Sequence, residues 1–261
     1  MSKNKQKNVG LFATCLVDLM RPSIGFATAR LLEKHGCTVH VPDSQTCCGQ
    51  PAYNAGDSAA ARALAENVIN AFEGFDYIVA PSGSCTGMIK LHFPALFKDD
   101  AAMAGRAQAM AAKTYELLEF LSDVLRVSES GATFASSVTY QDSCAGLREL
   151  GIKEQPRQLM ATVAGLELKE LDDGESCCGF GGLFSVKYPD ISGKIVDDKA
   201  QAIENTGADV LLGGDLGCLM NMAGRLQRRG SKVKVRHLAE VLAGMTDDVP
   251  PIGETNGETK D

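Results

Sequence analysis

The stretch Cys47-Cys48-Gly49, which recurs as Cys177-Cys178-Gly179, decides how this chain of 261 residues is interpreted. Each pair has one cysteine upstream and one downstream, so two sets of four follow one another: Cys15, Cys47, Cys48 and Cys85, then Cys144, Cys177, Cys178 and Cys218. Matching members lie 129, 130, 130 and 133 residues apart. Cysteines scattered through a core would not repeat in register, so the pattern indicates a duplicated four-thiol site.

The segments around the cysteines repeat as well. Residues 75–85, FDYIVAPSGSC, align with residues 208–218, ADVLLGGDLGC, and residues 117–121, LLEFL, align with residues 238–242, LAEVL. In the first half we expect strands at 8–14, 37–41 and 75–80 and helices at 22–35, from 57 or 58 onward and at 103–125. In the second half we expect strands at 133–141, 166–171 and 209–213 and helices at 156–164 and 190–205.

This alternation of strands and helices predicts an α/β fold with two similar parallel-sheet halves related by internal duplication. Open parallel sheets bind ligands beyond the carboxyl ends of their strands, which is where the cysteine sites are expected. We expect the first cysteine-rich half at 1–130 and the second at 131–245. Residues 246–261 are rich in Pro, Gly, Asp and Glu and are predicted to be a disordered tail.

Composition narrows the function classes. The net charge of −7 and the pI near 5.2 argue against a nucleic-acid surface. No apolar run approaches the roughly 18 residues of a membrane-spanning helix, and the polar N-terminus lacks a signal-peptide pattern. We therefore expect a cytoplasmic protein. In that reducing compartment, patterned thiols indicate metal binding or redox catalysis rather than structural disulfides.

Four thiolates per set select zinc, copper(I) or iron–sulfur clusters over hard cations. Structural zinc sites usually use short Cys-x₂₋₄-Cys knuckles, which neither set contains. Two adjacent cysteines bind a polynuclear cluster more easily than one small metal ion, because each thiolate can bind a separate iron. The glycine that follows lets the loop approach such a cluster, so the sequence favours two iron–sulfur clusters over zinc. A zinc-stabilised scaffold without enzymatic activity and a metal-free thiol–disulfide reductase remain as alternatives. Cys37 has no counterpart in the second half and is expected to be a core residue.

The motifs resemble those of a known family. Residues 11–18 (LFATCLVD), 47–52 (CCGQPA), 81–85 (PSGSC) and 177–182 (CCGFGG) resemble the CCG cysteine-rich domain, which heterodisulfide reductase contains twice in one of its polypeptides and which also occurs in the glycolate oxidase iron–sulfur subunit. The motif sequences are most similar to those of the lactate utilisation protein A family, and the resemblance covers roughly residues 8–245. This resemblance implies an iron–sulfur subunit of a cytoplasmic oxidoreductase complex that oxidises L-lactate, a small 2-hydroxy acid, to pyruvate, with lactate utilisation proteins B and C as partners.

The resemblance has one departure. The fuller family pattern ends each site in Cys-x-x-Cys, but Met88 and Asn221 stand at the positions of the fifth cysteine. Four cysteines suit an ordinary [4Fe–4S] centre. The eight repeated cysteines are therefore the expected cluster ligands, while no catalytic residue is assigned.

Other residues carry weaker signals. Residues 179–182 (GFGG) lack the strand and helix context of a nucleotide-binding loop, so they are expected to clear space around a cluster. Arg21 and Arg148 follow the first cysteine of each set and are weighed as ligands of a 2-hydroxy-acid carboxylate against solvated surface arginines, the commoner case. His40, His92 and His237 are expected to be structural, with His237 near the start of the last helix. Asp215, three residues before Cys218, is weighed as a residue that tunes a cluster or a proton transfer against an exposed turn aspartate, which is the expected case.

Overall fold

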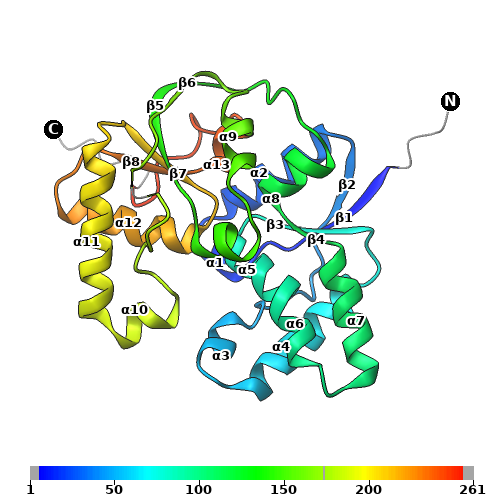
Figure 1. Ribbon diagram of the computed structural model, residues 1–261. Helices are drawn as coiled ribbons and strands as arrows, with labels where there is room; N and C mark the ends of the chain where they lie inside the picture. Colours follow the sequence, from blue (N-terminus) through cyan, green and yellow to red (C-terminus); the bar gives the residue numbers. More distant parts are fainter. Residues whose placement is uncertain (1–5, 173, 255–261) are drawn as a thin grey trace.

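A computed structural model describes residues 6–172 and 174–254 (Figure 1). It confirms the α/β class: two four-stranded sheets, each entirely parallel, follow one another along the chain. The first sheet contains β1 (Lys7–Leu11), β2 (Cys37–His40), β3 (Tyr77–Ala80) and β4 (Thr114–Glu116). The second contains β5 (Thr133–Gln141), β6 (Ala164–Leu168), β7 (Val210–Gly213) and β8 (Lys234–His237).

The two sheets have the same strand order, which bears out the duplication. The orders are β2-β1-β3-β4 and β6-β5-β7-β8. In each sheet the first strand of the half lies in the middle. The second strand pairs with it on one side and the third strand pairs with it on the other. The carboxyl ends of β1 and β3, and of β5 and β7, are therefore the switch points at which parallel sheets bind ligands.

Helices connect the strands. The first half contains α1 (Cys15–Met20), α2 (Pro22–Lys34), α3 (Gln50–Asn54), α4 (Ser58–Phe72), α5 (Gly83–Gly87), α6 (Phe93–Leu96), α7 (Ala101–Ala112) and α8 (Leu117–Glu119). The second contains α9 (Glu154–Met160), α10 (Leu183–Lys187), α11 (Pro189–Asn205), α12 (Leu216–Arg228) and α13 (Leu238–Leu242). Short π-helical segments cover Met88–His92, Phe120–Val124 and Ala145–Glu149.

Two predicted segments differ from the structure. The helix predicted at 103–125 is interrupted by β4, a strand of three residues whose flanking helices hide it in the sequence pattern. The predicted disordered tail begins with an ordered part: Ile252 donates its amide to the Val235 carbonyl at 2.7 Å, and Arg236 donates to the carbonyls of Thr246 and Val249. The rest of that tail, residues 255–261, lies outside the described residues.

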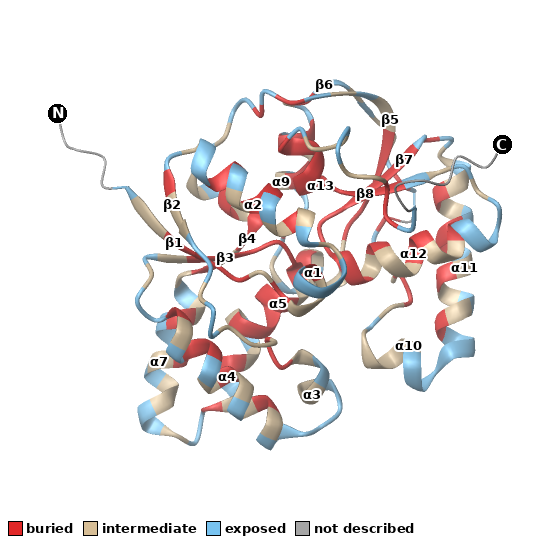
Figure 2. Cartoon of the chain, turned by 180° about the vertical axis from the view of Figure 1, so that it is seen from behind, coloured by how far each residue is buried: buried red, intermediate tan, exposed pale blue. Residues whose placement is uncertain are grey.

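A single hydrophobic cluster crosses from one half to the other. It joins Val9 and Leu31 of the first half to Val138 and Leu211 of the second, all fully or almost fully buried. The halves meet through two equivalent helix pairs, α2 with α13 and α9 with α8. In Figure 2 the largely buried helices α9 and α13 lie between the two sheets, whereas α7 and α11 carry exposed residues on the outside. We call the interface between the two halves, formed by this cluster and these helix pairs, the seam.

The seam also brings two backbones together at glycines. A Cβ atom added to Gly83 of α5 would lie 2.9 Å from the backbone nitrogen of Gly146 and 2.9 Å from Ser143 Oγ in the other half. Contacts this short to a backbone atom force the chain to move. A side chain at position 83 would therefore push the halves apart.

Gly83→Ala is expected to destabilise the protein by about 1–3 kcal/mol, the usual cost of overpacking. The matched control is Gly105→Ala in α7, where an added Cβ meets nothing within 4 Å. That change should stabilise the helix by about 0.5–1 kcal/mol. Urea unfolding of both variants measures the difference, and a Gly83→Ala protein as stable as the parent would contradict this description of the seam.

Candidate functional site

The first set of cysteines converges at the carboxyl end of the first sheet. Cys15 begins α1 directly after β1, Cys47 and Cys48 lie in the loop after β2, and Cys85 lies in α5 after β3. Cys15 Sγ is 3.8 Å from Cys47 Sγ, and Cys48 Sγ is 3.4 Å from Cys85 Sγ. We call these four residues thiol site 1.

The residues that precede two of these cysteines fix their positions. Thr14 has a positive φ of 63°, and its side chain accepts from the Val17 amide to begin α1. Such a backbone angle is costly for a residue with a branched side chain and is found mainly at functional sites. Ser82 begins α5 in the same way by accepting from the Cys85 amide at 3.3 Å.

The second set converges in the same manner. Cys144 follows β5, Cys177 and Cys178 follow β6, and Cys218 lies in the first turn of α12 after β7. Cys178 Sγ and Cys218 Sγ are 2.8 Å apart, and Cys144 hydrogen-bonds to Cys177. We call this set thiol site 2. All eight cysteines singled out in the sequence thus lie in two groups of four, and none of them forms a disulfide.

Glycine shapes both Cys-Cys loops. Gly49 and Gly179 have left-handed φ angles of 83° and 80°. A Cβ on Gly179 would lie 2.7 Å from the Ser192 carbonyl of α11, so a side chain there would be both strained and blocked. The Gly179 amide also donates to Cys177 Sγ at 3.3 Å. The loops therefore direct backbone donors at sulfur, an arrangement that stabilises a thiolate.

The thiols within each site share protons unequally. Hydrogen bonds from Cys15 and Cys48 lower the pKa of Cys47 to about 2, and hydrogen bonds from Cys144 and Cys178 lower the pKa of Cys177 to about 2. The same hydrogen bonds raise the pKa values of Cys15 and Cys144. Cys47 and Cys177 are therefore the thiols that ionise most readily in their sites, and metal binding would release protons from the others.

The two thiol sites open into separate cavities that share a wall. The cavity at thiol site 1, about 150 Å³, has a largely apolar lining that includes Leu16, Val17 and Pro51. The cavity at thiol site 2, about 260 Å³, is more polar and includes His92 and Glu149. Residues that line both cavities are Gln50, Ser84, Phe180, Gly182 and Asp215. The sites therefore lie on the two sides of one wall at the seam.

Asp215 connects the two halves in this wall. It is 6% exposed, and its Oδ2 accepts from Ser82 Oγ at 3.0 Å and from the Ser84 amide at 3.1 Å. It begins α12 without capping that helix through its side chain. The expectation that Asp215 is an exposed turn residue is wrong, because its carboxylate caps α5 of the other half.

The other residues singled out in the sequence lie in different parts of the structure. Arg21 does not face a substrate cavity: it forms a two-pronged ion pair with Glu240 across the seam, at 2.8 and 3.0 Å. Arg148 donates to the Glu175 carbonyl near the surface, and its charge helps lower the pKa of Cys177. Cys37 is buried in β2, outside both thiol sites, as expected. His237 begins α13, also as expected.

His92 and Glu149 were not predicted to line a site. His92 stacks against Tyr53 with ring centroids 4.7 Å apart, and its Nε2 lies 3.9 Å from Glu149 Oε2 of the other half. The sequence gives no signal for this pair, because the two residues meet only through packing of the halves.

The two positions that lack a fifth cysteine have structural roles. Met88 is fully buried in the core of the first half. Asn221 of α12 donates from Nδ2 to the Cys178 carbonyl at 2.8 Å and so supports the second Cys-Cys loop. Neither residue brings a further thiol to its site.

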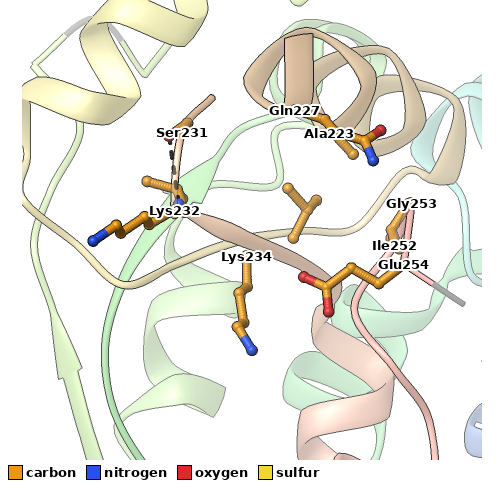
Figure 3. A pocket seen from close by; sticks show the side chains of 10 residues that line it. Ala223, Gln227, Ser231, Lys232, Lys234, Ile252, Gly253 and Glu254 are labelled. Carbon is orange, nitrogen blue, oxygen red and sulfur yellow. Dashed lines mark hydrogen bonds between the residues drawn. The ribbon is translucent and has the colours of Figure 1, made fainter. Parts of the chain in front are cut away.

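A larger hollow lies away from the thiols. It has a volume of about 450 Å³ beside β8, and Figure 3 shows its lining, with Gln227 from α12, Lys232 and Lys234 at the entry to β8 and Glu254 from the C-terminal segment. No cysteine lines it. The repeated cysteines therefore lie at the seam and not in this hollow.

Thiol sites 1 and 2 are suited to bind metal ions or a metal cluster through soft sulfur ligands. Within residues 6–172 and 174–254, no three His, Cys, Asp or Glu side chains form a ready-made site for one ion. The sulfurs of thiol site 1 instead form a sequence of neighbours, Cys15, Cys47, Cys48 and Cys85. In the same described ranges, no helix combines the length and apolar character needed to cross a bilayer.

Comparison with known proteins shows a family and a similar fold. The cysteine-rich domain family named CCG matches residues 9–90 and 138–223. Lactate utilization protein A of Anoxybacillus flavithermus is 50% identical over 235 residues, covering 90% of this chain and 98% of that protein. Its namesake from Bacillus subtilis is 48% identical over 234 residues, with the same coverage. A hypothetical protein from Helicobacter pylori has the same fold, with a TM-score of 0.58 and 15% identity over 97% of this chain, which spans 50% of that structure.

Proposed function

Because the chain belongs to the lactate utilization protein A family and carries the CCG cysteine-rich domain twice, we propose that it is an iron–sulfur subunit of an oxidoreductase that oxidises L-lactate to pyruvate. The family gives it a role in lactate utilisation. The electron-carrying role is supported by one observation above all: eight thiols meet in two groups of four on either side of one wall.

The residues present fit a cluster. Each site supplies four thiols from three segments that follow successive strands at the edge of a parallel sheet, together with backbone amides directed at sulfur. Four cysteines are the usual ligand number for a [4Fe–4S] centre, and hydrogen bonds to sulfur tune its potential. The proposed ligands are Cys15, Cys47, Cys48 and Cys85 at thiol site 1 and Cys144, Cys177, Cys178 and Cys218 at thiol site 2.

The chemistry divides between the bound group and the protein. When bound, each cluster would accept and return one electron at a time. The protein holds the sulfurs on rigid turns, through Thr14 and Ser82 in the first half and Asn221 in the second. Phe180 and Asp215 line both cavities and so form part of the wall between them.

The polar cavity at thiol site 2 is the better place for a small polar molecule. His92 and Glu149 face it, whereas the lining at thiol site 1 is mainly apolar. The name of the relatives further implies companion proteins, so lactate utilisation proteins B and C are the proposed partners in a cytoplasmic complex. Oxidation of the 2-hydroxy acid takes place either at this cavity or in a partner, with electrons passing through both thiol sites.

Metal and sulfide analysis of protein purified without oxygen tests the proposal. We expect about eight irons and eight sulfides per chain, with broad brown absorbance, as two [4Fe–4S] centres require. About two zinc ions without sulfide would contradict it and indicate a non-enzymatic scaffold. A metal-free chain that loses thiols on oxidation would instead indicate thiol–disulfide chemistry, which mass spectrometry with thiol labelling detects.

A further inference from the structure

Two buried ionisable residues occupy equivalent positions in the two halves. Glu116 ends β4 and precedes α8, and His237 ends β8 and precedes α13. Glu116 Oε2 accepts from the Leu118 amide at 2.6 Å, and His237 Nδ1 accepts from the Ala239 amide at 3.2 Å. They are 3% and 0% exposed. Both side chains thus begin the last helix of their half, at the seam.

Helix capping does not account for a carboxyl group at position 116. One oxygen would suffice for the cap, as a serine or asparagine provides. The second oxygen, Glu116 Oε1, is buried and has no hydrogen-bond partner among the described residues. A buried carboxylate without a positive partner costs several kcal/mol, so this group is held in its neutral form. Burial raises the pKa of Glu116 to about 8, within the range where it exchanges a proton near neutral pH.

The unpaired oxygen faces the wall between the thiol sites. Glu116 lines a small cavity together with Tyr140, Asp142 and Gly214. A Cβ on Gly214 would lie 3.3 Å from the Tyr140 hydroxyl and 3.7 Å from Glu116 Oε1, so both groups adjoin the residue that precedes Asp215. Asp215 in turn lines both thiol cavities. Glu116 is therefore separated from the two sites by a single layer of protein.

The charged groups around Glu116 determine how its pKa responds to a further charge. Glu119 on its own helix and Asp215 from the other half both act to raise its pKa. Tyr140 is itself neutral, because burial raises its pKa well above the usual value. Asp142 lines the same cavity but is paired with Arg157 by two hydrogen bonds of 3.0 Å. Lys90 is paired with Glu119 at 3.2 Å. Any further negative charge at the thiol sites would act in the same direction as Asp215 and raise the pKa of Glu116, because like charges disfavour its ionised form.

We propose that Glu116 is a proton-binding site coupled to the charge of the neighbouring thiol sites: under alkaline conditions, where its carboxyl group is ionised, it takes up a proton when an electron reaches a thiol site and releases it when the electron leaves. This inference rests on the proposed electron-carrying function. Oxidation of a 2-hydroxy acid to a 2-oxo acid yields two electrons and two protons. One electron at a thiol site and one proton on Glu116 Oε1 leave the net charge of the seam unchanged, while the second electron goes to the other thiol site and the second proton to solvent.

His237 provides a matched control from the duplication itself. Its Nδ1 lone pair accepts from the Ala239 amide, so protonation at Nδ1 would break the cap. Burial also lowers its pKa. His237 therefore stays neutral, although it occupies the equivalent position. His237→Asn keeps an acceptor for the cap, because asparagine is a favoured N-cap residue.

The experiment measures the reduction potential of the iron–sulfur centres as a function of pH, from about pH 6 to about pH 9, in the full chain loaded without oxygen. We expect the parent potential to be constant near pH 6 and 7, where Glu116 is protonated in both redox states, and to fall as the pH rises above about 8, by up to about 59 mV per tenfold change in proton concentration for one proton per electron. Glu116→Gln preserves the cap and should remove this slope. His237→Asn should retain it.

Three results would overturn the inference. Potentials of the parent that do not change with pH would do so while leaving the electron-carrying function intact, and so would a slope that persists in Glu116→Gln. A chain that takes up no iron and sulfide would overturn the proposed function together with this inference. Infrared spectra of the metal-free chain give an independent readout: the band of a protonated carboxyl group at neutral pH should be present in the parent and reduced in Glu116→Gln.

Discussion

Replacing Cys48 by alanine is expected to remove about half of the iron and sulfide from the anaerobically loaded chain, because one of two four-iron centres loses a ligand. Cys48 is 3% exposed and lies between Cys47 and Cys85 in thiol site 1. Cys178→Ala should remove the other half, and the double variant should bind almost none. Iron and sulfide analysis with electron paramagnetic resonance of the reduced protein distinguishes the two centres.

Cys37→Ala is the matched control for these variants. Cys37 is as deeply buried, at 4% exposed, but lies in β2 outside both thiol sites. Its loss should leave iron and sulfide unchanged. An equal loss of iron in Cys37→Ala, or full loading of Cys48→Ala, would contradict the assignment of ligands.

The second large effect concerns the ion pair across the seam. Arg21→Ala should destabilise the protein by about 3–5 kcal/mol, since it leaves a buried charge without its partner. Glu240 is fully buried in its side chain, and the Arg21 side chain is only 12% exposed. Among the described residues, Ser23 Oγ would still donate to Glu240 Oε1 at 2.6 Å, but a hydroxyl cannot neutralise the charge, and Arg236, which also feels the charge of Glu240, already donates to the Thr246 and Val249 carbonyls. Equilibrium unfolding in urea measures the loss.

An exposed pair shows whether burial is the cause. Lys194 and Asp198 lie one turn apart on α11, with side chains 73% and 65% exposed. Lys194→Ala should cost less than about 1 kcal/mol, because solvent screens surface pairs. If Arg21→Ala cost no more than Lys194→Ala, the seam would not depend on the buried pair.

The sequence predicted the elements with strong periodicity. The strand expected at 133–141 is β5 with the same limits, and the helix expected at 22–35 is α2, one residue shorter. In α2 the apolar residues at helical spacing, Ile24 and Leu31 among them, are buried as the pattern indicated. The duplication could be recognised because cysteines are rare enough for an offset near 130 residues to stand out.

What the sequence could not show are contacts between the halves. Nothing in the periodicity of either half indicates that Arg21 pairs with Glu240 or that His92 faces Glu149. Strands of three or four residues, such as β4 and β8, are too short for an alternating pattern to be distinguished from the helices beside them. The match of LLEFL with LAEVL did carry a signal for Glu116 and His237, since these residues directly precede the two repeats.

The contact between Ser82 and Asp215 has a consequence for how such a protein can vary. The two residues occupy equivalent positions, 133 apart like Cys85 and Cys218, and they meet at the seam. In a symmetric dimer of identical halves, one codon would specify both sides, and two facing aspartates would repel each other. Joining the halves in one polypeptide gives each side its own codon. Gene fusion thus permits a donor on one side and an acceptor on the other, and lets the two thiol sites diverge in chemistry while they keep a common architecture.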